Sequence, residues 1–343
     1  MSKIKPSKGA PYARIMGVGG YRPTRVVPNE VILETIDSSD EWIRSRSGIA
    51  TRHWASDEET VSMMSVEAAG KAIADAGIDP DQIGGVIVST VSHFKQTPAV
   101  ATDIAHRVGA GKPAAFDISA GCAGFGYGLT LAKGMIVEGS AEYVLVIGVE
   151  RLSDLTDLED RATAFLFGDG AGAVVVGPAQ EPAIGPTVWG SEGDKSETIK
   201  QTVAWNDFHI GDVSNLPLNE RGKVKFPAIT QEGQAVFRWA VFEMAKVAQQ
   251  ALEAAGISPE DLDVFIPHQA NMRIIDSMVK TLKLPDHVTV ARDVETTGNT
   301  SAASIPLAME RLLATGQAKS GDTALIIGFG AGLVYAATVV TLP

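Results

Sequence analysis

One cysteine in the chain stands in a setting that suits a nucleophile. Cys122 lies in the run DISAGCAGFGYGL, where a strand-like segment turns through small residues into a Gly-rich, apolar helical run. Such a strand–turn–helix elbow places the side chain at a helix N-terminus, where free backbone N–H groups and the helix dipole favour a thiolate. A lone cysteine is more often a small buried core residue. The Gly-rich elbow favours the reactive interpretation.

Two further polar residues are candidates for the same site. His268 ends the apolar strand DVFIPH and precedes the polar run QANMR, which predicts a position at the mouth of an α/β sheet, suited to proton transfer or oxyanion stabilisation. Asn299, in TTGNTSAAS, can donate its amide to a developing oxyanion. The alternatives are a hydrogen-bonded core histidine and a turn asparagine. We expect the other histidines in the core or on the surface: His53, His93, His106, His209 and His287.

The elements that would carry these residues repeat within the chain. The segment 70–90 reappears as 249–269, and both copies read as an Ala-rich helix, a Gly stop, a Pro turn and a β-branched strand. FDISAGC then matches RDVETTGN, and EYVLVIGVE matches DTALIIGFG. In this comparison Asn299 aligns with Cys122 once an insertion of one residue is allowed for. Two related elbows would bring both side chains to one central site.

The strand patterns indicate a layered α/β fold. VLVIG and ALIIG are continuous apolar runs, as expected for strands that helices cover on both faces. We expect a first half at 1–185 with the nucleophile and a second half at 231–343 with His268 and Asn299. The segment 186–230 has no counterpart in the repeat and is rich in Gly, Asp, Asn and Pro, so we interpret it as a connecting and capping insertion.

Composition excludes several classes of protein. The chain has 343 residues, 45% hydrophobic and 20% charged, which excludes a disordered or fibrous protein. The basic, polar start and the lack of any membrane-length apolar run predict a soluble cytoplasmic protein. The single cysteine excludes an internal disulfide and a cysteine-based metal cluster. A formal net charge of −12 argues against nucleic acid or an anionic membrane as the main partner.

Two Gly-rich runs resemble phosphate loops but lack the full dinucleotide spacing with a following helix and acidic residue: FGDGAGA at 167–173 and IGFGAGL at 327–333. We interpret the first as a tight turn that permits close backbone approach. The second is expected to bring backbone N–H groups near Ala331 to the thiol, as an oxyanion hole.

Three motifs, AGCAGFGYGL, PHQANMRII and GNTSAASIPLA, closely resemble in order and spacing those of β-ketoacyl-acyl carrier protein synthase III. The resemblance covers essentially the whole chain, and three motifs in the order Cys, His, Asn make it specific. It implies a five-layer αβαβα thiolase-like fold, a homodimer and initiation of type II fatty-acid synthesis. It implies no metal and no cofactor, because acyl-CoA is a substrate.

The resemblance also implies a role for each motif residue. Cys122 matches the nucleophile that an acyl-CoA primer acylates. His268 and Asn299 match the pair that promotes decarboxylation of malonyl-acyl carrier protein, whose enolate then attacks the thioester to give 3-ketoacyl-acyl carrier protein. Backbone N–H groups at Cys122 and near Ala331 would stabilise the tetrahedral oxyanion.

Residues outside the three motifs match binding positions of the family. Without the resemblance we would place the tryptophan among half-buried aromatics and the cations on the solvated surface. By position, the contacts with CoA adenine and phosphates fall to Trp42, Arg46 and Arg161. The contacts with the carrier protein fall to Arg238, Arg273 and Lys280.

One position departs from acetyl-preferring relatives. They carry a bulky Phe before Pro98 that projects into the partner subunit's acyl pocket, whereas this chain has Thr97. The smaller residue, with Phe329 as the other predicted gate, leaves more volume. We therefore expect branched or longer primers to be accepted, since each methylene in such a pocket is worth about 1–3 kcal/mol.

Rival families are separated by their residues. Thiolases need a second catalytic Cys, and elongating condensing enzymes pair the Cys with two His. Plant-type polyketide synthases share the Cys, His, Asn set but do not generally show PHQANMR. A papain-like cysteine hydrolase also has Cys, His and Asn in this order, but without internal duplication. A non-catalytic acyl-binding scaffold predicts loss of at least one of the three side chains.

Overall fold

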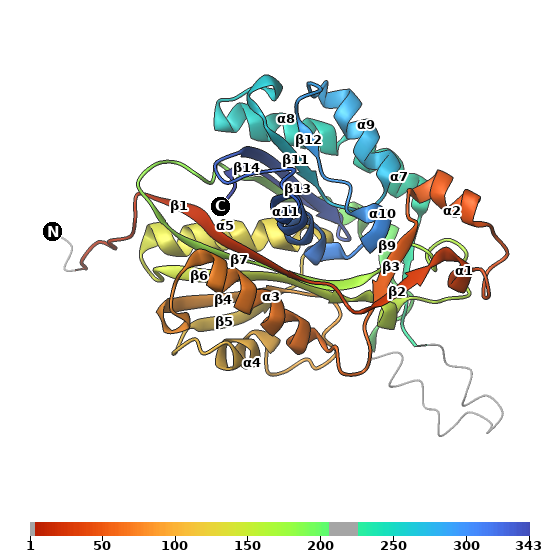
Figure 1. Cartoon of the computed structure of the whole chain (residues 1–343), viewed down its shortest axis with the longest axis horizontal. Coiled ribbons are helices and arrows are strands. Elements are labelled where there is room, and N and C mark those ends of the chain that lie inside the picture. Colours follow the sequence, from red (N-terminus) through yellow and green to blue (C-terminus); the bar gives the residue numbers. More distant parts are fainter. Residues whose placement is uncertain (1–3, 206–225) are drawn as a thin grey trace.

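The computed structural model describes residues 4–205 and 226–343. These residues build two five-stranded sheets of the same topology (Figure 1). In each sheet the strand next to one end runs antiparallel to both its neighbours, and the other neighbouring strands are parallel. The first sheet is β1 (Tyr12–Tyr21), β7 (Asp169–Ala179), β6 (Tyr143–Arg151), β4 (Ile83–Ser89) and β5 (Ala114–Ile118). The second is β8 (Val188–Ser191), β14 (Val334–Thr341), β13 (Thr323–Gly330), β11 (Val264–Pro267) and β12 (Thr289–Val290).

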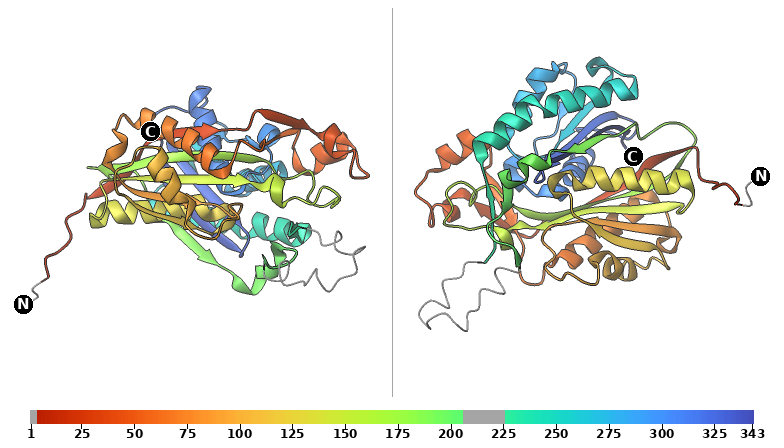
Figure 2. Two further views of the ribbon diagram at one scale, coloured as in Figure 1. Left: turned by 90° about the horizontal axis from the view of Figure 1, so that it is seen from below. Right: turned by 180° about the vertical axis from the view of Figure 1, so that it is seen from behind.

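Helices form three layers around the two sheets (Figures 1 and 2). Two lie between the sheets, α5 (Gly124–Glu138) and α11 (Ser304–Ala314). Outside the first sheet lie α3 (Val61–Ala76) and α4 (Val100–Arg107), and outside the second lie α8 (Met244–Ala255) and α9 (Met272–Leu282). This αβαβα arrangement confirms the predicted α/β thiolase-like fold.

The central helix α5 explains why its sequence is rich in glycine. It is packed between the two sheets, with Phe125 and Leu129 buried in the core that joins them. A Cβ on Gly128 would lie 2.8 Å from Val146 of the first sheet, and one on Gly126 would lie 2.8 Å from Ala336 of the second. Because real Cβ atoms do not approach this closely, glycine lets both sheets contact the helix.

A smaller lobe covers the end of the sheets at which the motif residues lie. It contains the hairpin β2 (Arg25–Pro28) and β3 (Thr51–Trp54) with the short helices α1 (Asn29–Ile32) and α2 (Asp40–Ser47). The fully buried Arg52 fastens this lobe by donating to Asn29 Oδ1 (2.7 Å) and to the carbonyl of Phe165 (2.9 Å). The other elements near this end are β9 (Ile199–Gln201), β10 (Ile229–Gln231), α7 (Gly233–Phe242) and α10 (Val294–Thr297).

The predicted insertion at 186–230 is partly built into a sheet. Strand β8, at 188–191, pairs antiparallel with β14, and Ile184 forms a bridge with Val340 just before it. Residues 206–225 of the expected insertion lie outside the described residues. We therefore propose that the second half begins near residue 184, and not at residue 231 as expected, because β8 supplies the last strand of the second sheet.

Candidate active site

The elbow at Cys122 begins where β5 ends. A 3₁₀ turn, η2 (Gly121–Ala123), leads directly into α5, so strand, turn and helix follow one another as predicted. Gly121 has φ +46°, in the left-handed region that favours glycine. A Cβ at this glycine would lie 3.4 Å from the backbone nitrogen of Ala331, so the turn and the Gly-rich run at 327–333 are in contact.

The second elbow carries Asn299 in front of η6 (Ser301–Ala303) and α11. Its backbone is held by the first half of the chain, because Asn299 N donates to the carbonyl of Leu166 (2.8 Å) and Gly168 N donates to the carbonyl of Asn299 (3.0 Å). Ser301 N donates to Asn299 Oδ1 (2.9 Å). This bond orients the amide so that Nδ2 is the group left to donate into the site.

Each elbow packs against a glycine in the central strand of the opposite half. A Cβ on Gly148 of β6 would lie 2.1 Å from the carbonyl oxygen of Ala302. A Cβ on Gly328 of β13 would lie 2.9 Å from the carbonyl oxygen of Cys122, and one on Gly330 would lie 2.8 Å from its sulfur. The two halves therefore interlock through the turns that carry the candidate residues.

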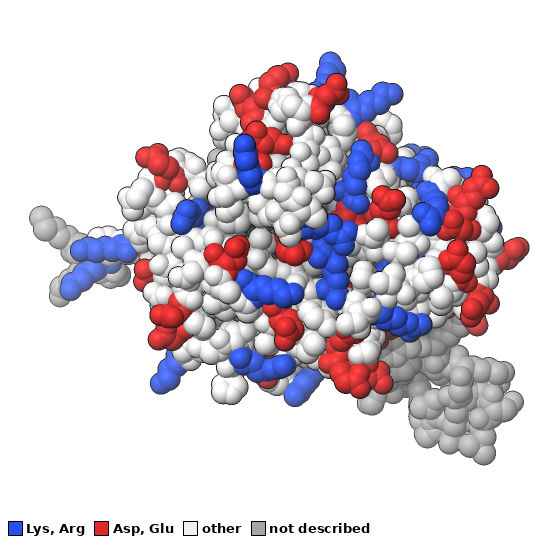
Figure 3. All heavy atoms as spheres, in the orientation of Figure 1, with Lys and Arg blue, Asp and Glu red and all other residues white. Residues whose placement is uncertain are grey.

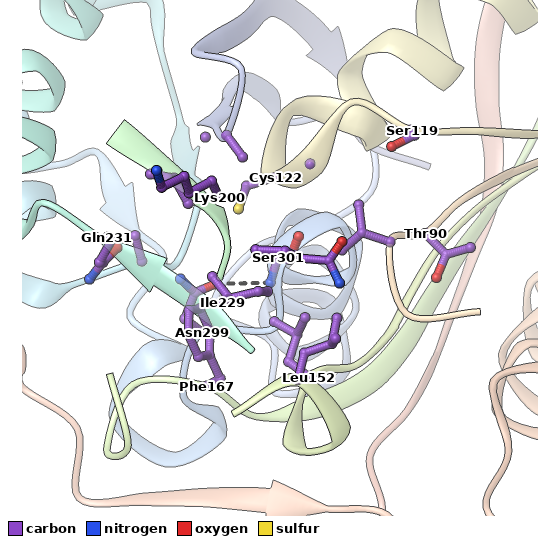
Figure 4. A pocket seen from close by; sticks show the side chains of 18 of the residues that line it. Thr90, Ser119, Cys122, Leu152, Phe167, Lys200, Ile229, Gln231, Asn299 and Ser301 are labelled. Atoms are coloured by element: carbon purple, nitrogen blue, oxygen red, sulfur yellow. Dashed lines mark hydrogen bonds between the residues drawn. The ribbon is translucent and has the colours of Figure 1, made fainter. Parts of the chain in front are cut away.

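The elbows meet at a cavity of about 720 Å³. Figure 4 shows Cys122, Asn299 and Ser301 around this space. The structure brings five predicted residues to its wall, namely Cys122, His268, Asn299, Phe329 and Ala331. Cys122 and His268 are far apart along the chain and belong to opposite halves, so the fold is what brings them to one cavity.

His268 lies just beyond β11, where its N–H donates to the carbonyl of Ile327 (2.7 Å). Its Nδ1 is 2.7 Å from Ser304 Oγ, and the Phe329 ring stands edge-on at 5.4 Å between centroids. Burial lowers the pKa of His268 to about 3, so the imidazole is neutral at physiological pH. A neutral ring whose Nδ1 accepts the Ser304 proton presents Nε2–H as a donor.

The thiol behaves differently from the expectation for a helix N-terminus. Burial raises the pKa of Cys122 to about 12, and the negative charge of Glu150 acts in the same direction. A hydrogen bond from Ser301 opposes them. Desolvation therefore outweighs the helix N-terminus here, and Cys122 is a thiol rather than a thiolate.

A second cavity, of about 530 Å³, adjoins the first. Trp42 and Arg46 lie on its wall, and the Arg161 guanidinium stands 4.9 Å from the centre of the Trp42 ring. The Arg46 guanidinium lies 5.9 Å from that centre. The three predicted CoA contacts are thus together. Both cavities are lined by Gln231, Val236, Ala270, Ile274 and Asn299.

The predicted carrier contacts are only partly brought together. Arg238 of α7 and Arg273 of α9 line the second cavity, and the Arg273 guanidinium stands 5.0 Å from the Phe237 ring centre. Lys280 lies about two turns further along α9, exposed and outside both cavities. Figure 3 shows Lys and Arg side chains over the region of α9 and α10, with acidic side chains on either side.

Comparison with known proteins assigns the family. The model "3-Oxoacyl-[acyl-carrier-protein (ACP)] synthase III" matches residues 116–193, and the model of the C-terminal part of this family matches 252–342. The chain is 88% identical to β-ketoacyl-[acyl-carrier-protein] synthase III 1 of Streptomyces coelicolor, over 100% of both chains. The chain belongs to the β-ketoacyl-[acyl-carrier-protein] synthase III family. The predicted family is therefore confirmed.

More distant members of the synthase III family also align along the whole chain. The mycobacterial synthase III of Mycobacterium marinum is 52% identical, over 100% of this chain and 99% of its own. Among solved structures, the priming β-ketosynthase of a polyketide pathway has a TM-score of 0.94 at 44% identity, covering 100% of this chain and 99% of that one. The synthase III of Aquifex aeolicus has a TM-score of 0.85 at 37% identity, covering 96% and 99%.

Thr97, the predicted gate of the acyl pocket, is exposed and does not line either cavity of its own chain. It precedes α4, whose first N–H groups, at Val100 and Ala101, donate to the Asp117 carboxylate of β5 (2.8 and 2.9 Å). The segment that carries Thr97 is thus fastened beside β5, which forms the edge of the first sheet.

The motifs of synthase III did not lead to every residue at this site. Glu150 and Ser301 lie beside the thiol, and neither was a candidate from sequence. His93, expected in the core or on the surface, lines the larger cavity, as do Phe94 and Trp205, whose rings are 5.2 Å apart between centroids. His209 lies outside the described residues.

Within residues 4–205 and 226–343 the structure contains no group of three or more His, Cys, Asp or Glu placed to bind a metal ion. No helix in the same residues is long and apolar enough to cross a membrane.

Proposed function

We propose that the protein catalyses the decarboxylative condensation of an acyl-CoA primer with malonyl-acyl carrier protein, which begins type II fatty-acid synthesis. The observation that carries the proposal is the meeting of Cys122, His268 and Asn299 at one cavity. Membership in the synthase III family, at 88% identity to a named synthase, supports the same reaction. A thiol with two neutral hydrogen-bond donors suits acyl transfer followed by enolate stabilisation.

The reaction would run in two halves through an acyl-Cys122 intermediate. In the first, the sulfur attacks the primer thioester while backbone N–H groups at Cys122 and Ala331 stabilise the oxyanion. In the second, malonyl loses CO₂ and the resulting enolate oxygen accepts hydrogen bonds from His268 and Asn299. The enolate carbon then attacks the acyl thioester. The buried, neutral imidazole of His268 supports this role, because it can donate a hydrogen bond to the enolate oxygen while it stays uncharged.

The second cavity suits the carrier arms of both substrates. Trp42 with Arg46 and Arg161 provides an aromatic face and two cations for a nucleotide with phosphates. Arg238 and Arg273 at the same mouth would meet an acidic carrier protein. Because acyl-CoA is consumed as a substrate, the scheme needs neither a resident cofactor nor a metal.

We propose a homodimer joined along β5. Among the residues that the structure describes, this strand has a neighbour, β4, on only one side, and it is part-buried and apolar at Ala115, Phe116 and Ile118. An unpaired apolar edge favours pairing with a second copy. Thr97 is fastened beside this edge, which supports its predicted reach into the partner's acyl pocket. Light scattering after size exclusion would test the dimer. A lone thiol also suits a reducing cytoplasm, where we place the enzyme.

A primer panel tests the reaction and the pocket together. The protein would be incubated with acetyl-, isobutyryl- and longer acyl-CoA esters and malonyl-acyl carrier protein, while CO₂ release and the 3-ketoacyl product are followed. We expect a product that depends on Cys122, with branched or longer esters accepted in the cavity of about 720 Å³. Cys122→Ser should yield none. Thioester hydrolysis without a condensed product would instead favour a cysteine hydrolase.

Thr97→Phe sharpens the test of primer choice. The larger side chain should shift preference toward acetyl-CoA by about 10-fold or more, because it fills space in the acyl pocket that a few methylene groups of a longer primer would occupy. Thr315→Phe is the control, since Thr315 is exposed at the end of α11. Equal preference profiles for both variants would remove Thr97 from the pocket.

A further inference from the structure

A buried carboxyl group outside the three motifs reaches the nucleophile through one hydroxyl. Glu150 is fully buried at the end of β6. Ser301 Oγ donates to Glu150 Oε1 (3.2 Å), and the turn that carries Ser301 packs against the turn that carries Cys122. The same hydroxyl lowers the pKa of the Cys122 thiol. A carboxylate, a hydroxyl and a thiol thus lie next to one another where the two halves meet.

The surroundings of Glu150 suit a proton acceptor. Its oxygens accept from Ser92 Oγ (2.6 Å), Val91 N (3.1 Å) and Thr90 Oγ1 (3.3 Å). No cation pairs with it among the described residues, and the next residue, Arg151, binds Asp154 instead (3.0 Å). The Cys122 thiol is near enough to this carboxyl group for its negative charge to raise the pKa of the thiol. Burial makes this carboxyl group more basic, and its donors offset that effect only in part by stabilising the charged form.

Ser301 occupies a backbone conformation that residues with a side chain rarely adopt. Its φ is +48°, in the left-handed region, and its N–H is fixed by Asn299 Oδ1. Non-glycine residues held there cluster at functional sites, where the surrounding structure over-determines them. Ser301 donates to the carboxylate and lies at the wall of the larger cavity, which Cys122 also lines.

We propose that Glu150 accepts the proton of the Cys122 thiol, through the hydroxyl of Ser301, when the primer is transferred. In this scheme Ser301 takes the proton of the reacting thiol and is a catalytic residue, whereas Glu150 acts through it and is a positioning residue. The inference rests on the proposed function and adds the step that activates the nucleophile. His268 already has Ser304 on its Nδ1 and is assigned to the second half-reaction.

The step balances as follows for acyl-CoA. The thiol proton passes to Ser301 Oγ while the Ser301 proton passes to Glu150, which becomes a neutral acid. The bond between the sulfur and the acyl carbon forms, the bond between that carbon and the CoA sulfur breaks, and the electron pair leaves with CoA. Glu150 then returns its proton through Ser301 to the departing CoA thiolate. Free CoA and acyl-Cys122 result, with the carboxylate restored.

The acidities of the two groups support this transfer. Burial raises the pKa of Glu150 to about 7, which places it in the range expected of a general base near neutral pH. The pKa of the thiol is raised to about 12, so few thiolates would form without a base. If Glu150 accepted no proton and were only close to the thiol, its negative charge would oppose ionisation of the thiol. The two roles predict opposite results when Glu150 is neutralised.

The test is the rate of CoA release in a single turnover with acyl-CoA alone, measured from pH 5 to 9. In the wild type the rate should rise through an inflection near pH 7. Glu150→Gln and Ser301→Ala should each lose about 10²-fold at pH 7 and lose the inflection, because a general base contributes about 10²–10⁴. Glu150→Asp should keep the inflection at a lower rate. Glu138→Gln, an exposed acid on α5, should match the wild type.

Two outcomes would overturn the relay. One is Glu150→Gln transferring the primer as fast as the wild type or faster, as expected if the charge only opposes the thiolate. The other is a slower rate with an unchanged pH profile, as expected if Glu150 merely supports the loop at 91–92. Ser301→Ala decides the matter if Glu150→Gln fails to fold, since Ala keeps the backbone N–H that binds Asn299.

A separate readout distinguishes this inference from the proposed function. Alkylation of Cys122 by iodoacetamide needs neither acyl-CoA nor malonyl-acyl carrier protein. At pH 7 the relay predicts slower alkylation in Ser301→Ala and Glu150→Gln, and equal or faster alkylation overturns it. A wild type that makes no ketoacyl product would defeat the proposed function, while this comparison would still decide the relay.

Discussion

The Cys122 elbow and the Asn299 elbow share a backbone plan but differ in how their side chains are held. Both lead through a 3₁₀ turn into a helix between the sheets, the first from strand β5 and the second from the short helix α10, and both contact a glycine of the opposite half. Cys122 is partly buried and lines the cavity, whereas Asn299 is 8% exposed and its Oδ1 accepts from Ser301 N. One elbow therefore presents a group that can change its bonds, and the other presents a fixed donor.

This difference teaches why two fused halves suit a two-step reaction. Each half alone would supply either the proposed nucleophile or the proposed donors, and the interlocked turns keep them at one cavity. The same interlocking brings Glu150 of the first half to Ser301 of the second. The predictions below remove or exchange single parts of these elbows.

Removal of the nucleophile should give the largest effect. Cys122→Ala leaves the elbow and both donors in place but has no sulfur to acylate, so condensation should fall by at least about 10³-fold. Mass spectrometry after incubation with acyl-CoA should find no acyl-enzyme. An acylated Cys122→Ala protein would mean that another residue is the nucleophile.

Removal of the fixed donor should affect only the second half-reaction. Asn299→Ala should slow decarboxylation of malonyl-acyl carrier protein by about 10²–10³-fold, the usual loss for one oxyanion donor. Acylation of Cys122 should remain close to the wild-type rate. The check is CO₂ release measured beside CoA release. Asn299→Asp, which keeps the Oδ1 acceptor for Ser301 N but has no amide donor, should show the same split. Equal losses in both half-reactions would contradict separate roles for the elbows.

The interlocking glycines should not be equivalent. Gly148→Ala would place a Cβ 2.1 Å from a backbone oxygen and Gly328→Ala one 2.9 Å from another, so the first should destabilise more. We expect losses of about 1–3 kcal/mol in the free energy of unfolding, measured by denaturant titration. Gly134→Ala, on α5 with open space around it, should be neutral or stabilising. If Gly328→Ala destabilised the protein more than Gly148→Ala, the two turns would relax in a way that these Cβ distances do not describe.

The buried imidazole should make acid destabilising. The pKa of His268 is about 3 in the folded protein and near 6.5 when unfolded, so between these values the unfolded chain binds more protons and stability falls as pH falls. His268→Asn should remove this contribution, up to about 3 kcal/mol at pH 4. Denaturant midpoints of both proteins from pH 7 to 4 provide the check. Glu150, with its raised pKa, acts in the opposite sense in both proteins, so only their difference reports on His268.

The docking residues should give the smallest effect. Arg273→Glu should raise the KM for malonyl-acyl carrier protein by about 5- to 10-fold at low salt and less at high salt, because a rim charge acts mainly on encounter. Lys280→Glu should act more weakly, since Lys280 lies outside the cavity mouth. Lys246→Glu, exposed on α8, is the control. A salt-independent effect would argue against electrostatic docking.

Sequence by itself determined the family, the α/β layering and the three motifs. These signals are local: a Gly-rich elbow around Cys122, a strand that ends at His268 and a Gly-Asn turn are each contained in a few consecutive residues. The repeat also predicted that Cys122 and Asn299 occupy equivalent turns, because duplicated halves keep the order of their elements.

Only the tertiary structure decided what surrounds those turns. Glu150 and Ser301 are 151 positions apart, and no local pattern marks their contact. The directions of the pKa shifts at Cys122 and His268 depend on burial by both halves, which a helix-terminus argument cannot supply. Strand β8 joins the second sheet for the same reason, since strand pairing is settled by a distant partner rather than by the residues of the strand itself.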